Sequence, residues 1–176
     1  MSVIEDCLQS DGHLLPADTP YGTTFEEIHR VFVENAPFRE RRELIFSALT
    51  LYSKVVWSLT PDAKLWIDGG FTTHKPWAAP NDADVVVLVP QDDFVRVVST
   101  ELELFLALST LQGVEVGLPN ATVQRIQPMA GLVDSFIQPD LEPVRATWHD
   151  TWSSVKGQDG RLVAGKRKGY LEVRNS

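Results

Sequence analysis

The sequence predicts one domain in which helices and strands are interspersed, and two stretches carry this prediction. Residues 38–59 place apolar side chains near a 3.6-residue period, as in a helix that packs on a core. Residues 83–89 instead form an almost unbroken apolar run, which is typical of a strand covered on both faces. With 176 residues, of which 43% are hydrophobic, the chain is long enough to bury one sizeable core.

The composition excludes several classes of protein. A formal net charge of −8 argues against a broad nucleic-acid-binding surface. Cys7 is the one cysteine, so the chain forms no intramolecular disulfide and suits a reducing cytosol. Residues 1–10 lack the basic start and apolar run of a signal peptide, and no stretch has the length of a transmembrane helix. We therefore expect a cytoplasmic protein with no membrane partner.

The first third of the chain predicts an irregular segment and two helices. Residues 1–21 contain two prolines and are expected to be irregular. Thr24 and Glu27 fit a capping box, which predicts a helix over residues 25–34 that ends before Pro37. The second helix, over residues 38–59, is predicted to expose one charged, solvated face made of Arg39, Glu40, Arg42 and Glu43.

The middle of the chain predicts two strands followed by a helix. Strands are expected over residues 65–68 and 83–89, and Pro90 ends the second of them. Asp92 or Asp93 is a candidate cap for a helix from residue 94, and residues 100–103 resemble a second capping box.

The last third predicts a strand with an acid inside it, a helix and a basic tail. Strands are expected over residues 122–126 and 132–137, and Asp140 and Pro143 suit a helix start. One face of that helix is apolar and is expected to form core or an interface: Val144, Trp148, Trp152 and Val155. Residues 157–176 are expected to form a turn at 158–160, a basic cluster at 166–168 and a short strand at 170–173.

Asp82 and Asp84 suggest a metal site at the start of the 83–89 strand. Side chains two residues apart on a strand point to the same side, so the two carboxylates lie together. They repel each other unless a cation lies between them, and Mg²⁺ accepts both carboxylate and phosphate oxygens. Gly69 and Gly70, just upstream, allow a tight turn with accessible backbone amides. The residues therefore predict a site for a metal-bound polyphosphate.

A third acid extends this pattern to a known superfamily. Gly69-Gly70, then residues 71–81, then Asp82-Ala-Asp84 and the distant strand residue Asp134 resemble the nucleotidyltransferase superfamily of the DNA polymerase beta type. The stretch IDGGFTTHKPWAAPNDADVVVLV is similar to small nucleotidyltransferase-like proteins of bacteria and phages, as are TTFEEIHRVFVENAPFRERRELIFSALTLY and KGYLEV.

The resemblance implies an α/β fold, with a small mixed sheet, helices packed on one face and a metal site at a sheet edge. It implies that Asp82 and Asp84 bind Mg²⁺ or Mn²⁺, while Asp134 completes a second metal site and activates the attacking hydroxyl. It further implies that a set of nearby residues contacts the nucleotide phosphates, namely Gly69, Gly70, Thr72, Thr73 and Lys75. The sequence departs from the family pattern at Gly70, where the family commonly has serine, and at the small Ala83.

The expected function is transfer of a nucleoside monophosphate from an NTP to a hydroxyl of a protein or an RNA 3′ end. By resemblance, the setting is a toxin–antitoxin or phage-defence system. The alternative is a non-catalytic module of the same fold that binds nucleotide or a partner protein. A third hypothesis is a homo-oligomer that associates through the face bearing Trp148 and Trp152.

Structural roles remain open for several of these residues. Asp84 could cap a turn or pair with Lys75, and Asp134 could pair with Lys64 or Arg145. His74 could contact substrate or lie on the surface. The cluster at 166–168 could be a solvated turn, or could contact phosphate or RNA.

Overall fold

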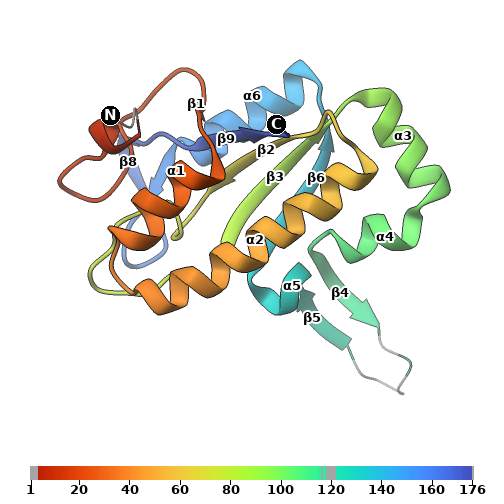
Figure 1. Ribbon diagram of the computed structural model, residues 1–176, viewed down its shortest axis with the longest axis horizontal. Coiled ribbons are helices and arrows are strands. Elements are labelled where there is room, and N and C mark those ends of the chain that lie inside the picture. Colours follow the sequence, from red (N-terminus) through yellow and green to blue (C-terminus); the bar gives the residue numbers. More distant parts are fainter. Residues whose placement is uncertain (1–3, 116, 118–121, 176) are drawn as a thin grey trace.

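A mixed five-stranded sheet lies at the centre of the protein (Figure 1). The computed structural model describes residues 4–115, 117 and 122–175. The strands follow the order β1 (Tyr21–Gly22), β9 (Leu171–Arg174), β2 (Lys64–Asp68), β3 (Ala83–Val89) and β6 (Val133–Pro139). β2 pairs antiparallel with both β9 and β3, whereas β3–β6 and β1–β9 are parallel. The predicted α/β class with a mixed sheet is confirmed.

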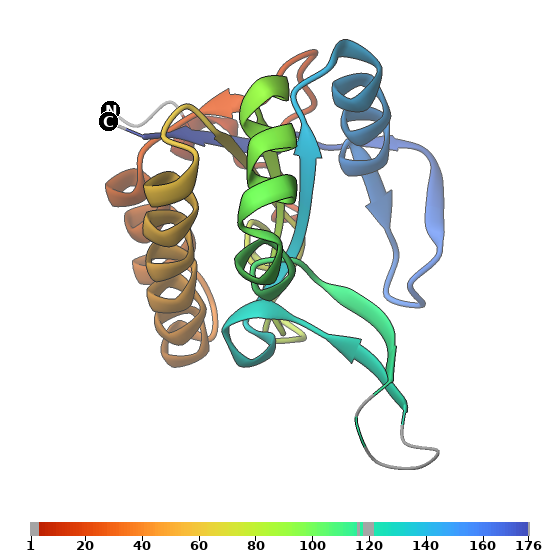
Figure 2. The ribbon, with the colours of Figure 1, turned by 90° about the vertical axis from the view of Figure 1, so that its right-hand side faces the viewer.

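Helices cover both faces of this sheet, which differs from the expected packing on one face (Figure 2). One face carries α1 (Phe25–His29), the π-helical turn η2 (Arg30–Glu34), α2 (Arg39–Leu59), α3 (Gln91–Thr100) and α4 (Leu102–Ala107). α6 (Glu142–Trp152) lies on the opposite face. Val85 and Val87 join the core beneath α2, while Val86 and Leu88 pack with Trp152. Both faces of β3 are thus buried, as its apolar run predicts.

The apolar face of α6 belongs to this second core. Trp152 packs with Trp66 and Tyr170 and is 6% exposed, and Trp148 packs against it. The expectation of core packing is therefore confirmed for Trp152, and a homo-oligomer built on that side chain is not compatible with its burial.

The starts of the helices agree only in part with the predicted caps. Thr24 Oγ1 accepts a hydrogen bond from the Glu27 backbone N–H at 3.2 Å, so the first cap is confirmed. α3 begins at Gln91 without a side-chain cap, so the roles given to Asp92 and Asp93 are wrong; the chain turns at Pro90 instead. Thr100 does not cap α4 either, because its hydroxyl donates back to the carbonyl of Arg96 inside α3.

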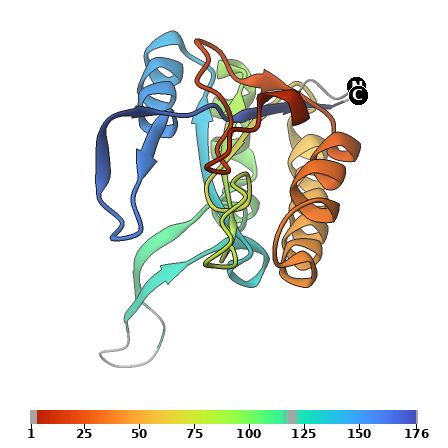
Figure 3. The same ribbon diagram turned by 90° about the vertical axis from the view of Figure 1, so that its left-hand side faces the viewer.

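Two hairpins project from the same end of the sheet (Figure 3). The first pairs β4 (Leu111–Glu115) with β5 (Thr122–Ile126), and the second pairs β7 (Ser154–Lys156) with β8 (Leu162–Arg167). The predicted turn at 158–160 joins the strands of the second hairpin. Two short turns complete the chain, a 3₁₀ turn η1 (Glu5–Cys7) in the N-terminal segment and α5 (Pro128–Gly131) before β6. Residues 1–3 of the segment expected to be irregular lie outside the described residues.

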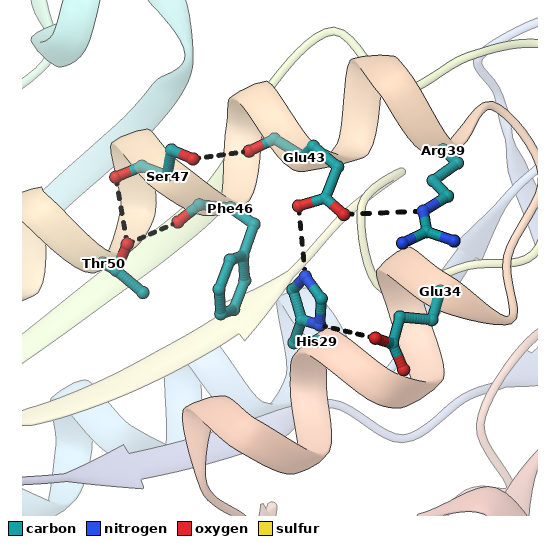
Figure 4. Close-up of polar contacts among 7 residues, drawn as sticks. All are labelled: His29, Glu34, Arg39, Glu43, Phe46, Ser47 and Thr50. Carbon is teal, nitrogen blue, oxygen red and sulfur yellow. Dashed lines mark hydrogen bonds and ion pairs between the residues drawn. The ribbon is translucent and has the colours of Figure 1, made fainter.

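The charged face of α2 is solvated except at one position. Arg39 and Glu43 form an ion pair at 3.5 Å, and Glu43 also contacts His29 at 3.1 Å (Figure 4). Arg42, however, is 0% exposed, so its placement on a solvated face is wrong. Its guanidinium donates to the backbone carbonyls of Phe32, Pro37, Phe71 and Thr73, which explains how the charge is accommodated inside the protein.

No helix among the described residues has the length and apolar character needed to cross a membrane.

Candidate functional site

Three aspartates form a row across neighbouring strands of the sheet. The register of β2, β3 and β6 pairs Asp68 with Asp84 and Asp84 with Asp134. Residues paired in register point to the same face of a sheet, which here is the face that carries α6. Asp68 and Asp134 are 6% and 4% exposed. The carboxylates of Asp84 and Asp134, about fifty residues apart in the chain, are therefore neighbours.

Sequence reasoning missed Asp68. It ends the strand before the glycine turn, where an acid is unremarkable in itself. Its importance comes from the antiparallel pairing of β2 with β3, which sets it beside Asp84. The two predicted strands follow one another with no predicted helix between them, and this was the signal that could have suggested their pairing.

These aspartates line a cleft of about 650 Å³. We call it the acid cleft. Asp82, two residues before Asp84, also lines it. One wall comes from α6 and the residues that follow it, and another from the β4–β5 hairpin. Its lining includes Asp68, Gly69, Gly70, Thr73, Lys75, Asp82, Asp84, Arg125, Asp134, Trp148, Lys156 and Lys168.

Each of three carboxylates in the acid cleft has a polar partner. Lys168 pairs with Asp68, and both side chains are largely buried. Arg125, from β5, pairs with Asp134, which also accepts a hydrogen bond from Thr110 Oγ1 at 2.7 Å. Gln127 donates to Asp82 Oδ2 at 2.8 Å.

The partners of Asp134 differ from those considered in the sequence. Lys64 and Arg145 instead hold Asp140, at 2.7 Å and 2.5 Å, so neither pairs with Asp134. The reason is their separation along β6, since Asp134 lies at the start of this strand and Asp140 directly follows its end.

The basic cluster 166–168 is not a solvated turn. Lys168 is 8% exposed and lies in the acid cleft. Its neighbours pair with other acids, Lys166 with Asp11 at 2.6 Å and Arg167 with Asp150 at 3.2 Å. The cluster therefore connects the end of β8 to three separate carboxylates.

Asp84 has the most perturbed ionisation in the acid cleft. Burial raises its pKa, and the nearby carboxylates of Asp82, Asp68 and Asp134 raise it further, while Lys168 acts in the opposite direction. The result is a pKa of about 7. No ion pair to Asp84 exists among the described residues, so the expected pairing with Lys75 is not formed.

The glycine turn brings the backbone against the Asp84 carboxylate. Gly69 has a φ of +85°, and a Cβ at this position would overlap Asp84 Oδ2. Only glycine combines an unstrained positive φ with the absence of a Cβ that would overlap the carboxylate. At Gly70 a Cβ would meet Pro80 at 3.6 Å, an ordinary van der Waals distance.

Thr72 and Thr73 turn their hydroxyls toward the protein. Both are buried, and they donate to the carbonyl oxygen of Gly69 at 3.4 Å and 3.0 Å. Thr73 lines the acid cleft, but Thr72 does not. Lys75 also lines the cleft, and burial and the nearby Lys168 lower its pKa.

Two arginines of α2 hold the loop between β2 and β3 from behind. Arg42 donates to the carbonyl oxygens of Phe71 and Thr73, and Arg41 donates to Pro80 O at 3.2 Å and to Asn81 O. His74 is half-buried, with its ring nitrogen 2.9 Å from Val31 O. His74 therefore anchors the loop, which answers the question that the sequence left open.

The acid cleft offers hard oxygen ligands for a metal ion. Asp82, Asp84 and Asp134 offer carboxylate oxygens, which Mg²⁺ and Mn²⁺ prefer. The pKa of Asp84 is raised by burial and, to a smaller extent, by the neighbouring carboxylates, both of which a bound cation would offset. No group of three or more His, Cys, Asp or Glu within the described part of the chain is arranged for metal binding as it stands. Because Arg125 forms an ion pair with Asp134, a cation that binds to the Asp134 carboxylate has to displace the Arg125 guanidinium.

Comparisons with known proteins identify a family. A family described as "Family of unknown function (DUF6932)" matches residues 7–174. No curated protein and no solved structure matches the chain.

Proposed function

This chain belongs to the DUF6932 family, whose function is unknown, and we propose that it is a metal-dependent nucleotidyltransferase. It transfers a nucleoside monophosphate from an NTP to a hydroxyl acceptor on a protein or an RNA. The observation that carries this proposal is the pairing of Asp84 with Asp134 in register on two parallel strands, with Asp82 in the same cleft.

The residues of the acid cleft fit the parts that this reaction needs. Asp82, Asp84 and Asp134 would hold Mg²⁺ or Mn²⁺, which when bound neutralises the phosphates and lowers the pKa of the attacking hydroxyl. Asp134 would take the proton of that hydroxyl once Arg125 is displaced from its carboxylate. As the new oxygen–phosphorus bond forms at the α-phosphate, the bond to the β-phosphate breaks and pyrophosphate leaves with its electron pair.

The phosphate-binding role falls to the glycine turn and to Lys75. Gly70 lines the cleft without a side chain, so phosphate oxygens can approach the backbone there. Lys75 has no carboxylate within 4.0 Å among the described residues, so its ammonium group is available to an anionic ligand. Thr73 would contribute chiefly by shaping the turn, since its hydroxyl is engaged with Gly69.

A transfer assay tests the proposal. The purified chain is incubated with Mg²⁺ or Mn²⁺, α-³²P-labelled NTPs, and either host RNA or cell lysate. We expect labelled acceptor with the wild type and a loss of at least about 100-fold in the double variant Asp82→Ala/Asp84→Ala. Asp92→Ala, at an exposed site on α3, is the control. Equal labelling by the wild type and the double variant would rule the proposal out.

A non-catalytic module is the second candidate, and one observation favours it. Lys168 and Arg125 already neutralise Asp68 and Asp134 without any metal. Thermal unfolding with saturating Mg·NTP separates the candidates in part, because a ligand at 100 times its Kd raises the melting temperature by about 5 °C or more in a protein of this size. Stabilisation without transfer indicates a nucleotide-binding module, and no stabilisation indicates a protein-interaction module.

The resemblance to small bacterial and phage proteins makes a toxin–antitoxin or phage-defence system, in the cytoplasm, the setting that we propose for this activity.

A further inference from the structure

A second hollow, of about 200 Å³, adjoins the acid cleft. We call it the basic groove. Its lining combines three lysines, a tryptophan and the β7–β8 turn, and consists of Asp11, His13, Lys75, Trp77, Val155, Lys156, Gly157, Gln158, Val163 and Lys166. His13, Lys75 and Lys156 line both hollows, so the basic groove leads into the acid cleft.

The groove is positive in a chain that carries a net charge of −8. Asp11 is the one carboxylate among the described residues that line it, and Lys166 pairs with it at 2.6 Å. Lys75 and Lys156 have no ion pair among the described residues, although both belong to an acidic protein with many carboxylates. Two ammonium groups without an ion pair at one short groove favour a ligand with at least two negative charges.

Trp77 is exposed in the same groove. Its side chain is 53% exposed, whereas Trp66 and Trp152 are buried and Trp57 and Trp148 are half-buried. A single exposed aromatic ring is common on protein surfaces, but this one lies in a groove lined by lysines. A ring beside lysines offers a stacking surface for a base next to binding sites for phosphates.

We propose that the basic groove binds a short single-stranded nucleic acid, with a base on Trp77 and a backbone phosphate on Lys156. Lys75, which lines both hollows, contacts a second strand phosphate when no NTP occupies the acid cleft and the NTP phosphates when one does. The shared lining then leads the terminal hydroxyl of the strand into the acid cleft. The strand is thus the acceptor of the proposed transfer reaction, and in this respect the inference rests on the proposed function. An acidic peptide is the less suitable occupant, because it would pair with the lysines and leave the ring of Trp77 uncovered.

The number of lysines that contact the strand determines the expected salt dependence of binding. For a single strand, each phosphate neutralised by the protein contributes about −0.7 to the slope of log K against log salt concentration. Two lysines that each neutralise one phosphate therefore predict a slope of roughly −1.4. This modest slope agrees with an acidic protein that has no broad nucleic-acid surface.

Binding is measured by fluorescence anisotropy with a short fluorescein-labelled oligouridylate in EDTA, where no transfer occurs. We expect Trp77→Ala to weaken binding by at least about 5-fold, and Trp77→Phe to retain most of it. Lys156→Gln is expected to reduce the salt slope by about 0.7. Lys54→Gln, at an exposed site of α2, is the matched control and should bind as the wild type does. Circular dichroism verifies that each variant is folded.

The inference would be overturned if the wild type does not bind the oligouridylate, or if the Trp77→Ala and Lys54→Gln variants bind it equally well. A labelled oligoglutamate peptide of the same length that binds more tightly than the oligouridylate would assign the groove to an acidic protein instead. The Asp82→Ala/Asp84→Ala variant should still bind the oligouridylate. Strand binding without transfer would contradict the proposed function but support strand binding by the basic groove. Transfer to protein without strand binding would support the proposed function but contradict strand binding by the groove.

Discussion

Gly69 and Gly70 are adjacent, but the acid cleft has room for a side chain at only one of them. At Gly69 a Cβ overlaps Asp84 Oδ2, and φ is +85°. At Gly70 the nearest atoms to a Cβ are those of Pro80, at 3.6 Å and 3.7 Å, and Lys75 Nζ, at 4.0 Å. The backbone and the Asp84 carboxylate therefore require glycine at position 69, whereas position 70 has space for a Cβ.

This contrast gives a paired prediction. Gly69→Ala should destabilise the protein by about 1–3 kcal/mol, because the backbone is strained and the Asp84 carboxylate has to move. Gly70→Ala should cost less than about 1 kcal/mol. Urea unfolding measures both changes, and Mn²⁺ titration should show weaker binding only for Gly69→Ala. Equal losses of stability would contradict the prediction.

At the scale of elements, α2 acts as the support of the loop between β2 and β3. Arg42 reaches through the core to four backbone carbonyls, two of which, Phe71 and Thr73, belong to that loop. The planar guanidinium can serve several acceptors at once, whereas a lysine ammonium cannot match their directions. The loop that carries Gly70 and Lys75 thus depends on a residue of a helix that does not line the acid cleft.

Replacement of this arginine tests the support. Arg42→Lys should destabilise the protein by about 3 kcal/mol, because buried carbonyls lose charge-assisted hydrogen bonds. Arg39→Lys, on the same helix and 62% exposed, should change stability by less than about 0.5 kcal/mol. Urea unfolding measures both, and proteolysis should cleave within residues 70–82 of the folded Arg42→Lys variant first. If Arg42→Lys unfolds no more easily than Arg39→Lys, then α2 does not support the loop.

For the whole molecule, local patterns in the sequence predict elements well but do not predict long-range partners. The cap at Thr24, the strand 83–89 and the turn at 158–160 depend on neighbours in the chain, and the structure contains all three. Helical periodicity placed Arg42 on a solvated face, although the side chain is buried. The spacing of residues along one helix cannot predict which backbone carbonyls other segments of the chain bring to it.

The same limit applies to the acid cleft. Asp82, Asp84 and Asp134 could be selected from the sequence, because a spaced acid pair and an acid within an apolar strand are unusual. Arg125 and Lys168 could not, since the β4–β5 hairpin and the end of β8 bring them there. Asp68 could be selected only by assuming that β2 pairs with β3. The charge balance of the cleft is therefore a property of the tertiary fold.

That charge balance should be measurable in the stability of the metal-free protein. The pKa of Asp84 rises from 3.8 to about 7 on folding, so the folded state holds a proton that the unfolded state releases. Ionisation of Asp84 therefore reduces stability as pH rises from about 4 to about 7, with a limit on the order of 4 kcal/mol. Burial lowers the pKa of His13 and His74, which reduces stability as pH falls below about 6.5 and masks this trend in the wild type.

The difference between the wild type and Asp84→Asn separates Asp84 from the histidines, which both proteins share. In EDTA, the stability of Asp84→Asn relative to the wild type should increase from pH 5 to pH 8, because asparagine has no charge to bury. Urea unfolding at several pH values measures this, with Asp62→Asn at an exposed turn as the control. A difference that does not change with pH would mean that Asp84 is ionised at little cost. The four carboxylates would then not repel one another strongly enough to require a proton, and the electrostatic support for a cation in the acid cleft would be lost.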